Sequence, residues 1–291
     1  MKNTLVGSIC LALAASIWGG MYVVVKIVVS VIPPLELVWI RYAVAIVALI
    51  IIGLITRQNW RIHKRDFLII IAIGFIGNTI SIVTQEMGTM LSTAQMGAII
   101  TSSTPAFMVI FARLLLKERV TFKKGLSICL ATMGVLLIVG AGHVNLSMKL
   151  GGIWLLIAAL TWAFMSVLVK RVPSEYSQIV VTTYSILVAL MVLTPFVLPR
   201  LHAMNVSQLT YPTIWGGLLY LGIVSTAGGF LLWNRGLQLL NASSGGLFFF
   251  FQPVVGTFLG WLILGENIGV RFWLGSGFIL IGVLLVIKEE K

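Results

Sequence analysis

Charged side chains inside apolar stretches are the groups of this sequence best suited to chemistry. Glu86 and Arg41 each lie several residues inside a run of apolar residues. An ionisable group at membrane depth is costly and usually belongs to a path for a solute or a proton. We therefore treat both as coupling or gating candidates. Glu86 lies near the end of its run, which also fits a solvated side chain. Arg41 has three interpretations: it extends to the water, pairs with Glu36, or meets an anionic substrate.

Small, polar and aromatic side chains share faces of otherwise apolar segments. The spacing puts Thr101 and Thr104 on one helical face with Gly97. Such faces point away from lipid, where they either pack against another helix or line a path for a solute. Together with deep aromatic residues they give a set of candidate cavity residues. This set is Trp18, Tyr22, Asn78, Thr101, Thr104, Trp162, Thr226, Phe249 and Gln252.

Pro105 and Pro253 are further gating candidates. A proline inside a helix removes one backbone hydrogen bond and can kink the helix at membrane depth. A single kink is commonly tolerated without a role, but here the proline recurs in two matching segments. We expect the bends to serve as hinges.

Several kinds of catalytic site are absent from the sequence. It has no phosphate-binding G-x-x-x-x-G-K-[ST] loop, no G-x-G-x-x-G, no H-E-x-x-H and no G-x-S-x-G. His63, His143 and His202 are scattered, and Cys10 and Cys129 are isolated. We expect no enzyme, no cofactor and no metal site, and we expect a gradient or an exchange, not ATP, to drive any movement of solute.

The segments that position these residues are apolar enough to cross a membrane. Of the 291 residues, 59% are hydrophobic and only 10% are charged. A stretch of about 20 apolar residues spans the hydrocarbon as a helix, and continuous apolar runs argue against a β-barrel. We predict an all-α polytopic membrane protein with ten transmembrane helices. Their expected ranges are 5–25, 34–55, 67–85, 93–116, 122–140, 150–169, 179–198, 213–233, 243–264 and 272–287.

The ten segments read as two copies of one unit. Residues 94–118 and 242–266 match at an offset of 148, with Pro105 facing Pro253 and Glu118 facing Glu266. Near the start of each copy, Trp18 corresponds to Trp162 at an offset of 144. We predict one five-helix repeat over residues 1–142 and another over residues 143–291. Because five is odd, the second repeat must cross the membrane with inverted topology.

The basic residues predict the orientation. With a cytoplasmic N-terminus, fifteen of the 20 lysines and arginines lie on the cytoplasmic side, which places both termini there. The net charge of +12 lies in short loops, so we expect contact with anionic lipid and not with nucleic acid. Lys26 and Lys170 end their helices, where a cation suits the helix dipole, and Glu118 is expected to cap a helix end. The sequence leaves the oligomeric state open and is compatible with a monomer.

The pattern resembles the EamA-type branch of the drug/metabolite transporter superfamily over nearly the whole chain. The likeness rests on the five-plus-five spans, on Trp18 and Trp162 with their following lysines, and on Pro33-Pro34 with Arg41. It also includes the two blocks that run from a proline to a glutamate. The resemblance implies a carrier in the bacterial cytoplasmic membrane that exports amino acids or related small metabolites by alternating access. It also implies a central cavity lined by the first, third, fourth, sixth, eighth and ninth helices.

Two other functions remain open from the residues. An exporter of drugs or lipophilic cations would need a carboxylate at membrane depth, and Glu86 is the candidate. A membrane-embedded enzyme or lipid-handling protein would need clustered acids, histidines or a nucleophile with its base, and none is evident.

Overall fold

The computed structural model describes residues 2–92, 97, 100–139, 146–201, 211–264 and 270–289, and these are helical and connecting segments without any strand. Six of the described helices are long and apolar enough to cross a membrane. They correspond to the first three and to the sixth, seventh and eighth expected spans. The ranges of these long helices are α1 (Lys2–Val28), α2 (Pro34–Ile55), Lys64–Leu91, α8 (Leu146–Val169), α9 (Gln178–Leu201) and Pro212–Leu239.

The third and eighth expected spans each contain a change of helix type. In the first, the 3-10 turn η1 (Lys64–Asp66) leads into α3 (Phe67–Ala72), the π-helical segment η2 (Ile73–Ser81) and α4 (Ile82–Leu91). The second consists of α10 (Pro212–Leu219), the π-helical segment η4 (Tyr220–Gly228) and α11 (Gly229–Leu239). π-Helical turns are uncommon and often occur at functional sites, so both segments are candidate positions for a functional site.

The fourth and ninth expected spans each change their helical hydrogen bonding before the proline. Residues 93–96 and 98–99 lie outside the described part, and α6 (Thr104–Leu116) starts after a turn at Ser102 and Ser103. The ninth span is a continuous helical run that consists of α12 (Ala242–Gly246), a 3-10 turn η5 (Leu247–Phe250) and α13 (Phe251–Leu264). Pro105 and Pro253 therefore lie in the first turns of α6 and α13, directly after these irregular turns.

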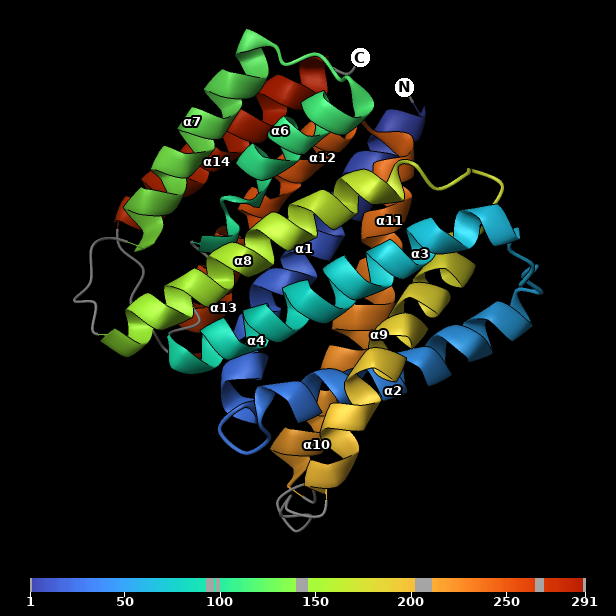
Figure 1. Cartoon of the computed structure of the whole chain (residues 1–291). Helices are drawn as coiled ribbons and strands as arrows, with labels where there is room; N and C mark the ends of the chain where they lie inside the picture. The colour runs from blue at the N-terminus through green and yellow to red at the C-terminus, as the bar shows by residue number, and fades with distance from the viewer. Residues whose placement is uncertain are drawn as a thin grey trace.

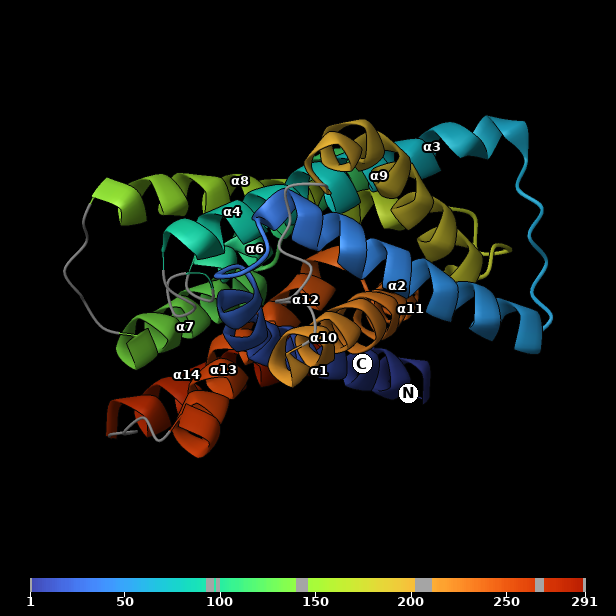
Figure 2. The same cartoon turned by 90° about the horizontal axis from the view of Figure 1, so that it is seen from below.

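The helices α7 (Phe122–Val139) and α14 (Val270–Glu289) pack against each other at one side of the bundle (Figure 1). In the centre, α1 packs against α11 and α13, and α8 packs against α4 and α6. The start of α1 and the end of α14 lie at the same end of the molecule, and α1 runs away from this end while α8 runs toward it (Figures 1 and 2).

Glycines allow the closest of these helix crossings. A Cβ atom on Gly88 of α4 would lie 2.8 Å from the carbonyl oxygen of Gly151 in α8. A Cβ atom on Gly236 of α11 would lie 3.1 Å from the carbonyl oxygen of Gly7 in α1. The two crossings occur at positions that correspond in the sequence repeat, and both depend on a missing side chain.

Two lysines tie the helix ends together. Lys26 Nζ in α1 donates to the carbonyl oxygens of Thr89, Met90 and Ser92 at the end of α4. Lys170 Nζ after α8 donates to the carbonyl oxygens of Leu237 and Leu240 at the end of α11. Each lysine stands at the end of its own helix, as expected, and also caps a neighbouring helix, which the sequence did not indicate.

Glu118 also acts on a distant segment. Its carboxylate accepts hydrogen bonds from the backbone N–H groups of Ala242 (3.0 Å) and Ser243 (3.1 Å) at the start of α12. The Ser243 hydroxyl donates to the same carboxylate and in turn accepts from Lys124 Nζ at 2.6 Å. The capping role expected for Glu118 is present, but the capped helix belongs to the other half of the chain.

Candidate functional site

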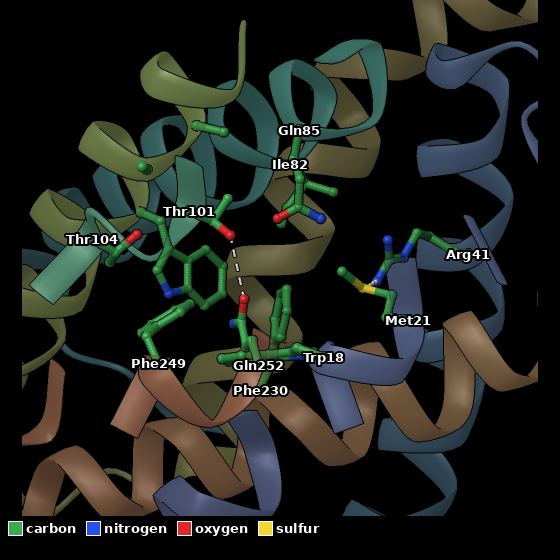
Figure 3. A pocket seen from close by; sticks show the side chains of 13 residues that line it. Trp18, Met21, Arg41, Ile82, Gln85, Thr101, Thr104, Phe230, Phe249 and Gln252 are labelled. Atoms are coloured by element: carbon green, nitrogen blue, oxygen red, sulfur yellow. Dashed lines mark hydrogen bonds between the residues drawn. The ribbon is translucent and has the colours of Figure 1, made fainter. Parts of the chain in front are cut away.

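A small cavity lies where the central helices cross (Figure 3). Its walls come from α1, α2, α4, α6, α8, α11, η5 and α13. The space open to the centre of a water-sized molecule is about 20 Å³, which holds about one water molecule. The lining residues are Trp18, Met21, Arg41, Ile82, Gln85, Thr101, Thr104, Ala158, Ala159, Trp162, Phe230, Phe249 and Gln252.

One wall of the cavity is polar. The Tyr22 hydroxyl donates to Thr101 Oγ1 at 2.9 Å, and Thr101 Oγ1 lies 3.4 Å from Gln252 Oε1. Figure 3 shows this contact between α13 and the segment before α6, with Gln85 above it. The Thr101 hydroxyl also donates to the carbonyl oxygen of Gly97 at 2.7 Å. Thr101 and Gln252 therefore bring polar atoms of the two halves close together across the cavity, through a longer and weaker contact.

The opposite wall is a cluster of aromatic rings. Trp18 contacts Trp162 edge to face with ring centroids 5.2 Å apart, and it stacks on Phe249 at 5.7 Å. Trp233 lies behind them, 4.6 Å from Phe249, and Phe230 lies 5.2 Å from Trp162. Trp18 is fixed further because its indole N–H donates to the carbonyl oxygen of Ser225 at 2.9 Å. Rings in such mutual contact form a stable wall for an apolar or aromatic group.

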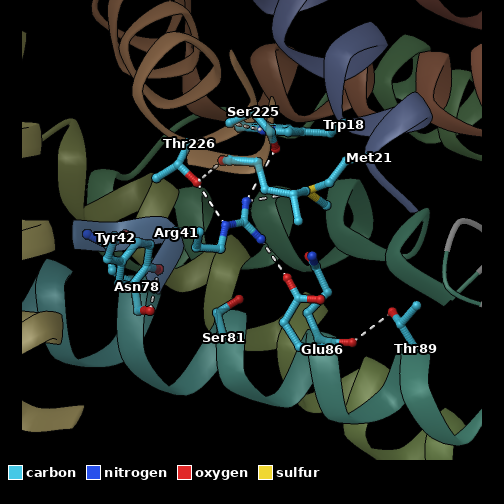
Figure 4. Close-up of polar contacts among 12 residues, drawn as sticks. Trp18, Met21, Arg41, Tyr42, Asn78, Ser81, Glu86, Thr89, Ser225 and Thr226 are labelled. Carbon is cyan, nitrogen blue, oxygen red and sulfur yellow. Dashed lines mark hydrogen bonds and ion pairs between the residues drawn. The ribbon is translucent and has the colours of Figure 1, made fainter. Parts of the chain in front are cut away.

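Arg41 forms a buried ion pair beside this cavity (Figure 4). Its Nη1 lies 2.5 Å from Glu86 Oε1, and neither side chain has any exposed surface. Nε donates to Thr226 Oγ1 at 2.9 Å, and Nη2 donates to Ser225 Oγ at 3.3 Å and contacts Met21 Sδ. Arg41 therefore neither extends to the water nor pairs with Glu36, and Glu86 is not solvated.

The ion pair has no charged counterpart in the second half. The position corresponding to Arg41 is Ser185, and the position corresponding to Glu86 is Asn234. Their surroundings nevertheless repeat, because Asn78 Nδ2 donates to Ser185 Oγ at 3.0 Å just as Arg41 bonds Thr226. The fold is thus stable with neutral groups at this crossing, and the charges serve another purpose.

Three rings of the aromatic wall belong to the second half alone. Phe230, Trp233 and Phe249 correspond to Ile82, Gln85 and Thr101. Phe230 and Phe249 border the cavity together with Ile82 and Thr101. At these corresponding positions, the second half therefore presents rings to the cavity and the first half presents smaller side chains.

Several polar atoms at the site have no hydrogen-bond partner in the described part of the chain. They are Gln85 Nε2, Thr104 Oγ1, Trp162 Nε1 and Glu86 Oε2. A buried polar atom without a partner costs roughly 1–3 kcal/mol. Three of them belong to residues that line the cavity, so a polar solute there would gain hydrogen bonds that the protein itself does not make. No group of three or more His, Cys, Asp or Glu residues that could hold a metal ion occurs among the described residues.

The residues expected from the sequence fall into four groups. Those on the cavity wall are Trp18, Arg41, Thr101, Thr104, Trp162, Phe249 and Gln252. Those one contact away are Tyr22, Glu86 and Thr226, which bond to wall residues. Asn78 lies further off, where its amide bonds Ser185 and its carbonyl oxygen accepts from the Tyr42 hydroxyl. Pro105 and Pro253 are buried directly after the irregular turns.

Sequence reasoning missed Met21, Ile82, Gln85, Ala158, Ala159 and Phe230 on the wall, and Ser225 behind it. Gln85 carried a signal, because it precedes Glu86 inside an apolar run. Phe230 carried a signal too, since an aromatic ring stands there where the first half has Ile82 at the corresponding position. The alanines and Met21 have no feature that separates them from packing residues.

Comparisons with known proteins agree with this architecture. The sequence model of the EamA-like transporter family matches residues 5–140 and again residues 149–288. An uncharacterized transporter of Archaeoglobus fulgidus is 26% identical over 97% of this chain and 99% of its own length. The uncharacterized transporter YoaV of Bacillus subtilis is 27% identical over 98% of this chain and 97% of its own.

Two further comparisons concern a short relative and a solved structure. The permease-like protein YdzE of Bacillus subtilis is 77% identical over 73 residues, which are 25% of this chain and 94% of that protein. A crystal structure with 18% sequence identity superposes with a TM-score of 0.76 over 99% of this chain and 97% of the other, and therefore shares the fold. The chain is a multi-pass membrane transporter and not an enzyme, and it belongs to the EamA-like transporter family.

Proposed function

We propose that this protein is a secondary transporter that exports amino acids or related small metabolites across the cytoplasmic membrane by alternating access. It would use ten transmembrane helices, arranged as two inverted five-helix repeats over residues 1–142 and 143–291, with both termini in the cytoplasm. The two matches to the family, the opposite directions of α1 and α8, and the repeated crossings at Gly88 and Gly236 support this arrangement. The excess of basic residues on the side of the termini supports the orientation.

The observation that carries the proposal is the cavity between the halves with its charged edge. Arg41 and Glu86 are the charged residues at this crossing, and the fold accommodates neutral residues at the corresponding place. A buried charge pair that packing does not require fits a binding or coupling role. We assign substrate contact to the cavity wall, and coupling to the Arg41–Glu86 pair.

The irregular turns before the prolines fit a gating role. The cavity has room for about one water molecule, whereas an amino acid is several times larger. Binding therefore requires the walls to separate. The turn before Pro105 and the 3-10 turn before Pro253 interrupt the α-helical hydrogen bonding of the two segments that supply Thr101, Thr104, Phe249 and Gln252. Rotation at these turns would widen the cavity toward one side at a time.

The test is flux in proteoliposomes loaded with a panel of labelled amino acids, sugars and drugs. We expect saturable, gradient-dependent flux of amino acids or related metabolites, and at least a tenfold loss with Gln252→Leu, which removes the polar bridge to Thr101. Ser147→Ala is the control, because Ser147 is exposed and is not among the residues that line the cavity. If none of the panel moves across the membrane with the wild-type protein, the proposal is wrong.

A second candidate is the export of lipophilic cations. The rings of Trp18, Trp162 and Phe249 favour a cation, and Glu86 Oε2 has no partner among the described residues. Glu86→Gln separates the two candidates in a drug-resistance assay. If the variant protects cells as well as the wild type does, cation antiport has lost its coupling group.

A further inference from the structure

A second polar cavity lies away from the central one, at the end of the molecule where both termini lie. Its volume is about 410 Å³, which is within the range of small-molecule sites. The connection from α8 to α9 and the first residues of α9 form one side, and α11 forms the other (Figure 1). The lining residues are Ser174, Glu175, Tyr176, Ser177, Gln178, Ile179, Leu231, Arg235 and Gln238.

The corresponding place in the first half is apolar. Glu175, Tyr176 and Gln178 correspond to Val31, Ile32 and Pro34, and Arg235 and Gln238 correspond to Met87 and Met90. Ile32 packs into the main hydrophobic core there. The fold thus needs no polar residues at this junction, and the charged and amide groups of the second half need another explanation.

Gln178 is the strongest sign of a ligand. Its side chain is only 8% exposed, and neither its amide oxygen nor its amide nitrogen has a hydrogen-bond partner in the described part of the chain. A buried amide normally has partners for both atoms. Gln178 lines the cavity, but its two amide atoms lie just beneath the surface. A small shift of the wall would let a ligand that brings both a donor and an acceptor satisfy them.

The segment that holds Gln178 is fixed in place. The Tyr176 hydroxyl donates to Asp66 Oδ2 at 2.7 Å and accepts from the backbone N–H of His63 at 3.2 Å. These bonds tie the connection before α9 to the segment before α3. Because this wall is already ordered before binding, less conformational entropy is lost when a ligand binds.

The two charged groups define the ligand. Glu175 supplies a carboxylate from the connection, and Arg235 supplies a guanidinium from α11, where its Nη1 donates to Gln238 Oε1 at 3.0 Å. The guanidinium of Arg235 has further N–H groups, and their planar fork suits a carboxylate or a phosphate. A carboxylate and a guanidinium in one cavity complement a molecule with one positive and one negative group.

We propose that this cavity is a second binding site, separate from the central one, for a group that carries an ammonium next to a carboxylate or a phosphate. The anion contacts Arg235, the ammonium contacts Glu175, and the amide of Gln178 supplies the remaining hydrogen bonds. A free amino acid and the headgroup of phosphatidylethanolamine share this chemistry. The inference does not depend on the proposed transport activity.

Calorimetric titration of the purified full-length protein in a maltoside detergent tests the site. The probes are L-alanine and O-phosphoethanolamine, with propionate and ethylamine as molecules of a single charge. We expect both zwitterions to bind and both single-charge molecules to bind at least tenfold more weakly. Equal binding of propionate or ethylamine would overturn the assignment of the ligand.

Three variants locate the binding. Arg235→Met introduces the residue found at the corresponding position, and Gln178→Leu removes the unpaired amide, so both should fold. We expect each to weaken zwitterion binding at least tenfold, and we expect Gln178→Leu to raise the melting temperature. Arg61→Met is the matched control, since it removes an exposed arginine from another loop. Wild-type affinity in both pocket variants would overturn the proposal, as would a loss of all binding by Glu86→Gln alone.

Nanodiscs distinguish the source of the ligand. If phosphatidylethanolamine occupies the cavity, O-phosphoethanolamine binds more weakly in discs of that lipid than in discs of phosphatidylglycerol. If a free metabolite is the natural ligand, the affinity is the same in both. Flux in liposomes is measured separately, so absent transport with retained zwitterion binding would contradict the proposed function and leave this site in place.

Discussion

Arg41 and Glu86 form a pair whose cost the fold must offset. Burying two charges carries a desolvation penalty of several kcal/mol per ion, and good geometry with further hydrogen bonds is needed to recover it. Arg41 donates such bonds to Thr226 and Ser225, whereas Glu86 Oε2 has none within the described residues. The arginine is therefore held by more hydrogen bonds than the carboxylate.

Changing this pair to its neutral counterparts tests its role. We expect Arg41→Ser and Glu86→Asn each to lower the free energy of unfolding by about 3–5 kcal/mol, because each leaves a buried charge unpaired. The double variant should recover at least half of this loss, since Ser185 and Asn234 occupy the corresponding positions without any charge. Chemical denaturation in detergent measures all three variants. Additive losses in the double variant would mean that the two side chains do not act as a pair.

The candidate site was predictable where residue type alone indicates burial at a polar face. Thr101, Trp162 and Gln252 stood out for that reason and lie on the cavity wall. The pairing of Arg41 with Glu86 was not predictable, because the two are far apart in the sequence and Glu36 is a nearer acid. Which acid pairs with Arg41 depends on how α2 crosses α4, and no local pattern in the sequence predicts that crossing.

At the scale of the elements, charged side chains join the helix ends to other segments. Lys26 caps α4 within the first half, Lys170 caps α11 within the second half, and Glu118 caps α12 across the two halves. The sequence indicated that these residues act at helix ends, because charge at a terminus is a local rule. It did not indicate which helix, since a side chain that reaches a neighbouring helix leaves no periodic signal.

Removal of the Glu118 carboxylate should destabilise the contact between Glu118 and the start of α12. We expect Glu118→Ala to lower the free energy of unfolding by about 1 kcal/mol, the usual cost of removing a helix cap. Glu118→Gln should lose less, because its amide oxygen still accepts one N–H of α12. Thermal unfolding in detergent measures the series. Glu175→Gln is the control, since its side chain is 58% exposed. A Glu118→Ala variant as stable as this control would contradict a capping role.

The glycine crossings give a second prediction for the elements. Alanine at Gly88 or Gly236 brings a methyl group to within 2.6 Å of Leu155 Cγ or 2.4 Å of Leu11 Cγ, so the helices must separate. We expect each substitution to cost about 1–3 kcal/mol. Gly216→Ala is the matched control, because a Cβ atom there meets nothing within 4 Å. Unfolding curves in detergent compare the three. Equal stability of all three would mean that α4 and α11 do not make tight contacts.

The helices themselves were more predictable than their interruptions. The ends of α2 coincide with the expected range, and α8 and α9 extend the expected ranges by only a few residues. A hydrophobic run predicts the ends of such a helix because the length of the helix must match the thickness of the membrane. The π-helical segments and the turn before Pro105 have no comparable signal, since they depend on packing against helices of the other half.

At the scale of the whole molecule, corresponding residues of unequal size set the shape of the interior. Phe230, Trp233 and Phe249 are large rings at positions where the first half has the smaller Ile82, Gln85 and Thr101. Of these, Phe230, Phe249, Ile82, Gln85 and Thr101 line the cavity. The two halves therefore present unequal surfaces to the cavity, although they share one helical plan.

The orientation of the halves can be tested with two cysteines at corresponding positions. Ser30 follows α1 and Ser174 follows α8, and both are exposed. We expect Ser30→Cys to react with a membrane-impermeant maleimide added outside the cell, and Ser174→Cys to react only after the cells are opened. Cys10 and Cys129 are first replaced by alanine to remove the background. This contrast follows because an odd number of crossings in each repeat inverts the second. Labelling of both positions from the same side would contradict inverted repeats, and with them the alternation of one cavity between two faces of the membrane.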